Sequence, residues 1–130
     1  MERSTRQRSA IRAVIDAAQR PLSPQEVLDS AQLEVPALGI ATVYRNIKLL
    51  LEEGAVRAVS LPGSGPRYES VPHDHGQAGH HHHFQCTECD RVFVVDRCPG
   101  DLKKLAPKGF SVEHHELTLY GHCKECRAVS

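Results

Sequence analysis

Two Cys-x-x-Cys pairs constrain this chain more than any other feature of its sequence. Cys86 and Cys89 form the first pair, and Cys123 and Cys126 form the second. Each pair can present two thiolates on one tight turn, and four thiolates make the closed tetrahedral site that Zn2+ prefers in structural positions. A zinc ion shared by both pairs would join distant parts of the chain and contribute directly to the free energy of folding. Two disulfides, or a redox-active thiol pair, are the alternatives.

Length and composition favour a small protein that needs such a metal ion. The chain has 130 residues, a formal net charge of zero, 40% hydrophobic residues and 25% charged residues. Two small domains of this size would bury little apolar surface, so a stabilising metal site is expected. No apolar run approaches the roughly 18 residues that span a bilayer, and the first residues do not form a secretory signal. We therefore expect a cytoplasmic protein without a membrane partner, where paired cysteines more often hold metal than form disulfides.

Apolar periodicity predicts three helices in the N-terminal half. The first covers about residues 5–19 and ends before Pro21. A capping box of Ser23 and Glu26, with proline between them, predicts that a short second helix begins there. The third is expected over residues 41–53, ended by a glycine at position 54. Its predicted buried stripe consists of Val43, Ile47, Leu50 and Leu51.

A predicted hairpin completes the N-terminal domain. Residues 55–61 and 67–71 are β-prone, and a turn rich in proline and glycine joins them. Three helices and a hairpin in this order predict a winged helix-turn-helix over residues 1–71. Residues 72–79 are polar and are interpreted as a hinge. Residues 80–130 are expected to form a small C-terminal α/β domain, with strands at 82–86, 92–96 and 112–120 and a short helix at 101–106. The fold class is therefore α+β.

The third helix occupies the position of a DNA-recognition helix. The face opposite its apolar stripe can reach phosphates and base edges in the major groove. Arginines near the N-terminus can reach an adjacent minor groove. The predicted DNA-contacting residues are Arg3, Arg6, Thr42, Tyr44, Arg45 and Lys48. The alternative is a solvated polar helix face without a ligand.

Four consecutive histidines, residues 80–83, directly precede the first cysteine pair. If they enter a strand, His80 and His82 point to one face and His81 and His83 to the other, so one run can serve two metal sites. Imidazole with carboxylate suits zinc, iron, nickel or manganese, and an added thiolate favours zinc. Further possible ligands are Glu69, His73, Asp74, His75, Cys98, Asp101, His114, His115 and His122.

Several of these motifs together resemble the ferric uptake regulator family of bacterial metal-dependent repressors. They are TRQR at 5–8, GIATVYRN at 39–46, the histidine run with its cysteine pair, and LYGHC at 119–123 with the second pair. The resemblance implies an N-terminal winged helix, a hinge and a C-terminal dimerisation domain. It also implies a homodimer that binds a pseudo-palindromic double-stranded operator when loaded with metal, and that represses genes of metal uptake or homeostasis.

The resemblance also implies roles for individual residues. Tyr44 and Arg45 match the pair that contacts bases and phosphates, and the four cysteines match the structural zinc ligands. A second metal site in the dimerisation domain corresponds to His80, His82, Asp101 and His115. Part of the regulatory metal site corresponds to Glu69, His81 and His83.

The regulatory site departs from the family pattern. Pro21 stands where the iron- and peroxide-sensing branches place a histidine, and Val94 stands where a carboxylate is usual. We expect His73, His75 or Cys98 to complete the ligand set. Zn2+ is the favoured regulatory metal over Fe2+, Mn2+ or Ni2+, and an iron- or peroxide-responsive regulator of the same family is the alternative.

Two other classes of protein are weaker interpretations. A zinc hydrolase needs an open coordination position and a general base, and no His-Glu-x-x-His spacing occurs. We therefore expect neither catalysis nor a small organic substrate. A zinc-holding protein without DNA-binding activity would lack basic residues on the third helix, but Arg45 and Lys48 are present. Oxidation of the cysteine pairs would release zinc, and Cys98 is the most reactive thiol if it binds no metal.

Overall fold

The computed structural model describes residues 2–71, 82–95 and 102–129. The chain divides into two compact units, Met1–Gln77 and Ala78–Ser130. The predicted hinge, residues 72–79, lies outside the described residues, so the domain limits at 71 and 80 stay a prediction. Within the described ranges, no helix is long and apolar enough to cross a membrane.

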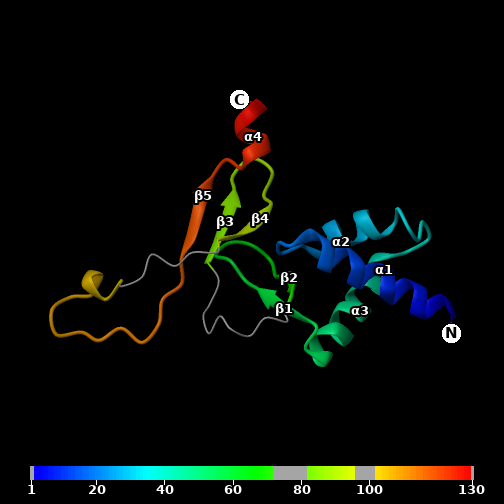
Figure 1. The fold of residues 1–130 in the computed structure, drawn as a ribbon, viewed down its shortest axis with the longest axis horizontal. Coiled ribbons are helices and arrows are strands. Elements are labelled where there is room, and N and C mark those ends of the chain that lie inside the picture. The colour runs from blue at the N-terminus through cyan, green and yellow to red at the C-terminus, as the bar shows by residue number, and fades with distance from the viewer. Residues whose placement is uncertain (1, 72–81, 96–101, 130) are drawn as a thin grey trace. The chain divides into compact units, whose positions relative to one another are not determined.

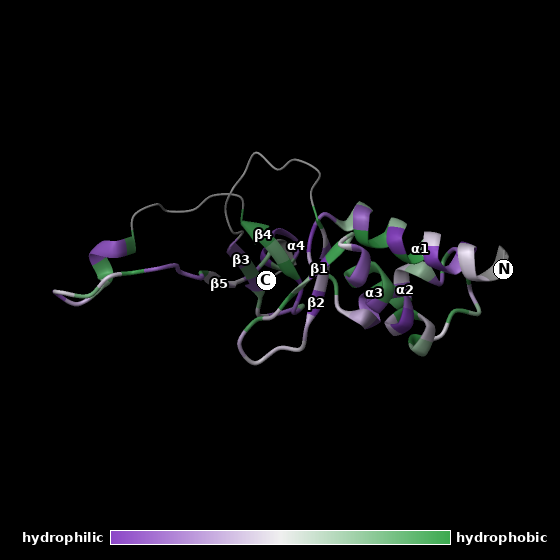
Figure 2. Cartoon of the chain, turned by 90° about the horizontal axis from the view of Figure 1, so that it is seen from below, coloured by the Kyte–Doolittle hydropathy of each residue, from purple (hydrophilic) through white to green (hydrophobic). Residues whose placement is uncertain are grey.

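The N-terminal unit is built on three helices, α1 (Glu2–Ala18), α2 (Pro24–Ala31) and α3 (Ile40–Glu53) (Figure 1). Each carries hydrophobic and hydrophilic stretches side by side (Figure 2). Their apolar faces meet in one core, which includes Ile11, Ile15, Val27, Ala31, Val43, Ile47 and Leu50. The predicted capping box is confirmed, because the Ser23 hydroxyl accepts from the Glu26 backbone N–H and the Glu26 carboxylate accepts from the Ser23 N–H.

The buried stripe of α3 differs from the predicted one at two positions. Leu51 was expected inside but is 37% exposed, so that assignment is wrong. Each helical residue turns the side chain by about 100°, which carries Leu51 past the edge of the stripe that ends on Leu50. Asn46 is buried instead, and its amide is satisfied because Nδ2 donates to the Thr42 carbonyl oxygen at 2.8 Å. A buried polar residue is tolerated here because it has this partner.

A two-stranded antiparallel hairpin, the wing, follows α3. It consists of β1 (Val56–Val59) and β2 (Arg67–Ser70), each shorter than predicted. Leu22, between α1 and α2, exchanges two backbone hydrogen bonds of 2.8 Å with Tyr68 and so extends the sheet. The Tyr68 side chain joins the helical core. These contacts fix the wing on the helices and give the predicted winged helix.

The C-terminal unit contains a three-stranded sheet in the order β4-β3-β5. Its strands are β3 (His82–Cys86), β4 (Val92–Val95) and β5 (Thr118–Gly121), and α4 (Lys124–Val129) follows them. β3 pairs with β4 in the antiparallel sense and with β5 in the parallel sense. Parallel neighbours need a long crossover connection, and this chain places residues 96–117 between β4 and β5.

Two predictions for this unit need correction, and one helix was not predicted. The expected strand at 112–120 forms only at Thr118–Gly121, the segment that pairs in register with β3. The expected helix at 101–106 is one 3-10 turn, η1 (Leu102–Leu105). Leu105 is 80% exposed, so η1 lacks the buried apolar face that stabilises a longer helix. Helix α4 was not predicted, since a six-residue helix shows little periodicity.

Gly54→Ala tests the end of α3. Gly54 has φ +79° and caps the helix with hydrogen bonds to Leu50 and Leu51. An alanine in this left-handed conformation should lower the free energy of unfolding by about 1 kcal/mol. Chemical denaturation measures this loss. Gly65→Ala, at a position with open space and no positive φ, should change stability much less; equal losses would contradict the capping role.

Candidate metal centre and nucleic-acid interface

The parallel pairing of β3 and β5 brings the two cysteine pairs together. Cys86 is the last residue of β3 and lies opposite Gly121 in β5, so the chain after each strand turns at the same end of the sheet. Cys123 follows β5 and Cys126 lies in α4. The four Sγ atoms all lie within 4.8 Å of one another. Within the described ranges, this is the one cluster of three or more side chains that could hold a metal ion.

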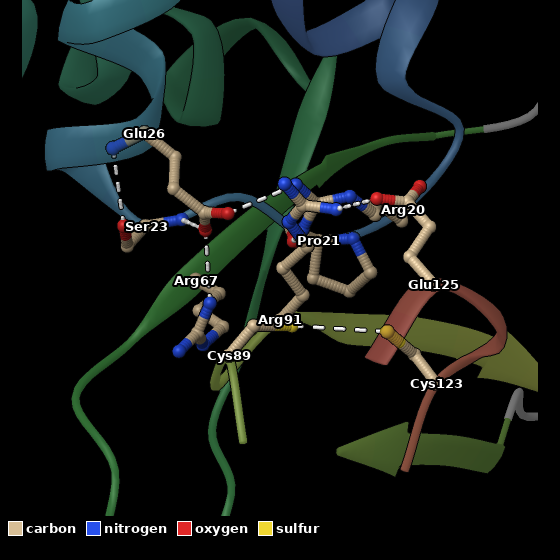
Figure 3. A network of polar contacts seen from close by, with 9 residues as sticks. All are labelled: Arg20, Pro21, Ser23, Glu26, Arg67, Cys89, Arg91, Cys123 and Glu125. Carbon is tan, nitrogen blue, oxygen red and sulfur yellow. Dashed lines mark hydrogen bonds and ion pairs between the residues drawn. The ribbon is translucent and has the colours of Figure 1, made fainter. Parts of the chain in front are cut away.

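The spacing of the sulfur atoms fits a tetrahedral metal site. Zinc–thiolate bonds of ~2.3 Å give a tetrahedron with sulfur–sulfur edges of ~3.8 Å. The Sγ atoms of Cys89 and Cys123, from different pairs, are 3.8 Å apart (Figure 3). A disulfide requires about 2.05 Å, and all four thiols are free. The donor set and its spacing therefore fit zinc and not the alternative of two disulfides.

The pKa shifts within the cysteine cluster indicate that all four thiols ionise together only around a central cation. Burial opposes ionisation of Cys86, but backbone N–H groups of Cys89 and Cys123, each 3.4 Å from its Sγ, lower its pKa to about 6. The pKa of Cys126 is raised to about 12, first by its hydrogen bond with Cys123 and then by burial. Burial raises the pKa of Cys89 as well. Neighbouring thiolates repel one another, so a divalent cation is needed to hold all four ionised.

Polar contacts also tie the two cysteine turns to each other. Thr87 donates its backbone N–H to the Gly121 carbonyl oxygen at 2.7 Å, and its hydroxyl donates to the same oxygen at 3.2 Å. Arg91, after the first pair, forms a 3.0 Å ion pair with Glu125, between the cysteines of the second pair (Figure 3). The ion pair is exposed and contributes little stability by itself. These contacts orient the two turns toward a common centre.

Two of the four residues predicted for a second metal site lie side by side. His82, on β3, is 1% exposed, and its ring stacks on that of His115 with centroids 5.1 Å apart. The other two, His80 and Asp101, lie outside the described residues. The stacked rings agree with a shared site, but the complete ligand set stays a prediction.

The described residues include two of the six predicted for regulatory metal binding. Glu69, on β2, is 5% exposed and accepts a 2.6 Å hydrogen bond from Arg57 Nε, its register partner on β1. His83 lies half-buried on β3. His73, His75, His81 and Cys98 lie outside the described residues. Sequence reasoning missed Arg57, because the partner of Glu69 depends on the hairpin register.

The two unusual positions in the regulatory pattern offer no metal-ligating side chain in the structure either. Pro21 is fully buried, before α2, and Val94 is a half-buried residue of β4. Neither proline nor valine carries a donor atom in its side chain. Any regulatory metal must therefore find its ligands elsewhere.

The outer face of α3 carries the predicted DNA-contacting side chains. Tyr44 is 54% exposed, and Arg45 and Lys48 are also exposed on the side away from the core. Thr42 is half-buried, and its hydroxyl accepts from the Arg45 guanidinium at 3.3 Å. The outer face of α3 thus carries an exposed ridge of two cationic side chains and one aromatic side chain, namely Arg45, Lys48 and Tyr44.

The two N-terminal arginines are less clearly placed for DNA binding. Arg6 is exposed and donates to the Glu34 carbonyl oxygen at 3.1 Å, which ties α1 to the turn after α2. The side chain of Arg3 lies outside the described residues. The minor-groove role of both stays a prediction.

A partly buried ion cluster in the N-terminal unit was predicted only in part. Glu26 accepts hydrogen bonds of 2.9 Å from the guanidinium groups of Arg20 and Arg67, in addition to its bond with the Ser23 N–H (Figure 3). Burial opposes ionisation of Glu26, but the Ser23 N–H and the two arginines outweigh it and lower its pKa. The sequence pattern identified Glu26 as a helix cap, and its partner on β2 depends on the tertiary fold.

Known proteins are similar to this chain over both of its units. The model of the "Ferric uptake regulator family" matches residues 2–120. The chain is 30% identical over 128 residues to the "Peroxide operon regulator" of Bacillus subtilis (strain 168), covering 95% of this chain and 83% of that protein. It also resembles a solved zinc-bound manganese uptake regulator, with TM-score 0.75, 26% identity and coverage of 90% and 87%.

A zinc uptake regulator of Mycobacterium tuberculosis gives a TM-score of 0.50 with 28% identity, covering 96% of this chain and 95% of that one. The similar structures confirm the α+β fold, with a winged N-terminal unit and a small C-terminal sheet. They also span proteins named for different metals. The structural similarity therefore indicates the fold that these regulators share, but it does not determine which metal ion this protein binds.

Cys89→Ser tests the metal centre. Cys89 is exposed, so serine fits the space, but the tetrahedral donor set loses one thiolate. The variant should lose stoichiometric zinc in elemental analysis and should unfold at a lower temperature. Glu88→Gln, which changes an exposed side chain between the two cysteines of the first pair, is the matched control and should keep its zinc. Full zinc content and unchanged thermal unfolding in Cys89→Ser would refute the assignment.

Proposed function

The chain belongs to the ferric uptake regulator family, and from this premise we propose that it is a repressor that binds an operator as a metal-loaded homodimer. The family comprises metal-responsive transcription regulators and not enzymes. The observation that carries the proposal is the exposed ridge of Tyr44, Arg45 and Lys48 on α3, opposite a helix face buried in the core. A helix anchored on one face with cations on the other suits the major groove of double-stranded DNA.

We assign a structural role to zinc in the four-cysteine site. Cys86, Cys89, Cys123 and Cys126 would hold the ion, which supplies the positive charge that four neighbouring thiolates require. The site joins the ends of β3 and β5 and so stabilises the C-terminal unit. That unit is the proposed dimerisation domain, and the repressor is proposed to act in the cytoplasm.

For the regulatory input, the relatives favour the iron- or peroxide-responsive alternative over zinc-dependent control of metal uptake. The full-length similarity to a peroxide operon regulator supports this choice. One structural observation supports zinc as a second candidate, namely Pro21, which provides no ligand where iron- and peroxide-sensing members carry a histidine. The proposed regulatory ligands are Glu69, His73, His75, His81, His83 and Cys98, and those of the second site are His80, His82, Asp101 and His115.

A DNA-binding titration separates these candidates. The chelated protein, still carrying its tightly held structural zinc, is titrated with Fe2+, Mn2+, Zn2+ or Ni2+ against genomic operator fragments, before and after hydrogen peroxide. A peroxide-responsive regulator should bind with Fe2+ and lose that binding after peroxide, whereas a zinc-responsive one should bind with Zn2+ and resist peroxide. Binding that is equal with and without added metal would refute the metal-responsive function.

Arg45→Ala tests the DNA-reading role of α3. Arg45 is exposed and donates an exposed 3.3 Å hydrogen bond to the Thr42 hydroxyl, so its replacement should leave the unfolding temperature unchanged. Operator binding should weaken by about 1–3 kcal/mol, as for loss of an arginine–base contact. Fluorescence anisotropy measures the affinity. Lys108→Ala, an exposed cation of the C-terminal unit, is the control for lost charge, and equal effects of the two changes would contradict the role of α3.

A further inference from the structure

We propose that Glu26 is a positioning residue for DNA binding, because it joins the start of β2, next to the tip of the wing, to helix α2, which packs against α3. The inference rests on the proposed function, since it assigns Glu26 a role in the same DNA-binding unit. Glu26 Oε1 accepts from Arg67 Nη1 at 2.9 Å and from the Ser23 N–H at 2.9 Å. One carboxylate thus holds the wing and the start of α2 at the same point (Figure 3).

Helix α2 transmits this position to the recognition helix. Its inner residues Val27, Leu28 and Ala31 are buried in the same core as Val43, Ile47 and Leu50 of α3. The loop between α2 and α3 is also held by a hydrogen bond, because Gln32 Nε2 donates to the Leu38 carbonyl oxygen at 2.9 Å. Close-packed cores resist sliding, so α2 and α3 move as one body. A group fixed to the first turn of α2 is therefore fixed relative to α3.

Arg67 is the matching point on the wing. It is the first residue of β2 and directly follows the loop at 60–66 that forms the tip of the hairpin. Side chains alternate along a strand, so Arg67 and Tyr68 lie on opposite faces of β2. Tyr68 is held by the helical core and Arg67 by Glu26. β2 is thereby held on both faces at the end of the strand that adjoins the tip of the wing.

The cluster depends on the charge of Glu26. The Arg67 side chain is 10% exposed, and within the described ranges its Nε is buried without an acceptor. Arg20 shares the same carboxylate through Oε2 at 2.9 Å. Replacing the carboxylate with an amide removes the negative charge that Arg67 and Arg20 share, and it turns an N–H donor toward one of the two guanidinium groups. Arg67 would then move toward water and carry the start of β2 with it.

Other contacts keep the fold intact when this one is lost. The paired backbone hydrogen bonds of Leu22 with Tyr68 remain, as does the hydrogen bond from Ser70 to Asp16 at the far end of β2. The apolar core does not include Glu26. Loss of the carboxylate should therefore loosen the wing near residue 67 and leave α3 folded.

Glu26→Gln tests the proposal in the full-length, zinc-containing protein, with Asp29→Asn as the matched control. Asp29 lies on the same helix and undergoes the same loss of charge, but it is exposed and bonds to Gln25 within α2. Hydrogen exchange should rise at the amides of β1 and β2 in Glu26→Gln and stay unchanged along Val43 to Leu50. Operator binding at saturating metal should weaken by about tenfold, and Asp29→Asn should match the wild type.

Hydroxyl-radical footprinting distinguishes positioning from a general loss of stability. With DNA saturated by the variant, protection by the wing at the flanks of the site should weaken while protection by α3 persists. Arg67→Lys, which keeps the charge but offers a single ammonium group, should show the same pattern more weakly and carries the test if Glu26→Gln does not fold. Unchanged exchange in the hairpin, or exchange raised equally in α3, would overturn the proposal. Failure of the wild type to bind any operator would instead refute the proposed function, and the exchange experiment would still decide whether Glu26 holds the wing.

Discussion

The C-terminal unit depends on the parallel pairing of β3 with β5. This pairing is the long-range contact that places the turn after Cys86 beside the turn before Cys123, although most of the unit's chain separates them. Parallel strands contribute little by themselves in a sheet of three. Four sulfur atoms that converge within 4.8 Å supply what the small sheet lacks, since a shared cation makes the pairing and the metal site stabilise each other.

Each unit brings together groups that carry, or can acquire, the same charge, and each needs an opposite charge at the centre. The signs of these charges are reversed between the two units. In the C-terminal unit, four thiols crowd together and need a central cation before all of them ionise. In the N-terminal unit, the guanidinium groups of Arg20 and Arg67 converge on one carboxylate, Glu26. Each centre fastens segments that lie far apart in the sequence. Removal of the central charge leaves like charges facing one another in a partly buried place, where their repulsion is poorly screened.

Features encoded by adjacent residues could be predicted from the sequence, and features set by register or packing could not. The capping box at Ser23, the helix end at Gly54 and the Cys-x-x-Cys turns each depend on a few neighbouring residues, and the structure contains all three. The assignment of Leu51 to the core was wrong because it lies at the edge of the stripe, where tertiary contacts decide burial. The strand at 112–117 does not form because strand pairing needs a neighbour, and the order β4-β3-β5 provides one only from Thr118 onward.

The same limit explains why the metal ligands proposed for regulation were harder to assess than the zinc site. Glu69 was singled out as a possible ligand, and the hairpin register sets Arg57 opposite it with a 2.6 Å hydrogen bond. A metal ion that takes Glu69 as a ligand must therefore share the carboxylate with, or displace, a guanidinium that already neutralises it. The competing cation is covalently tethered, so its effective concentration does not fall when metal is scarce. Binding of a regulatory metal through Glu69 then requires enough further ligands to outweigh the competition from Arg57, and neither Pro21 nor Val94 provides one.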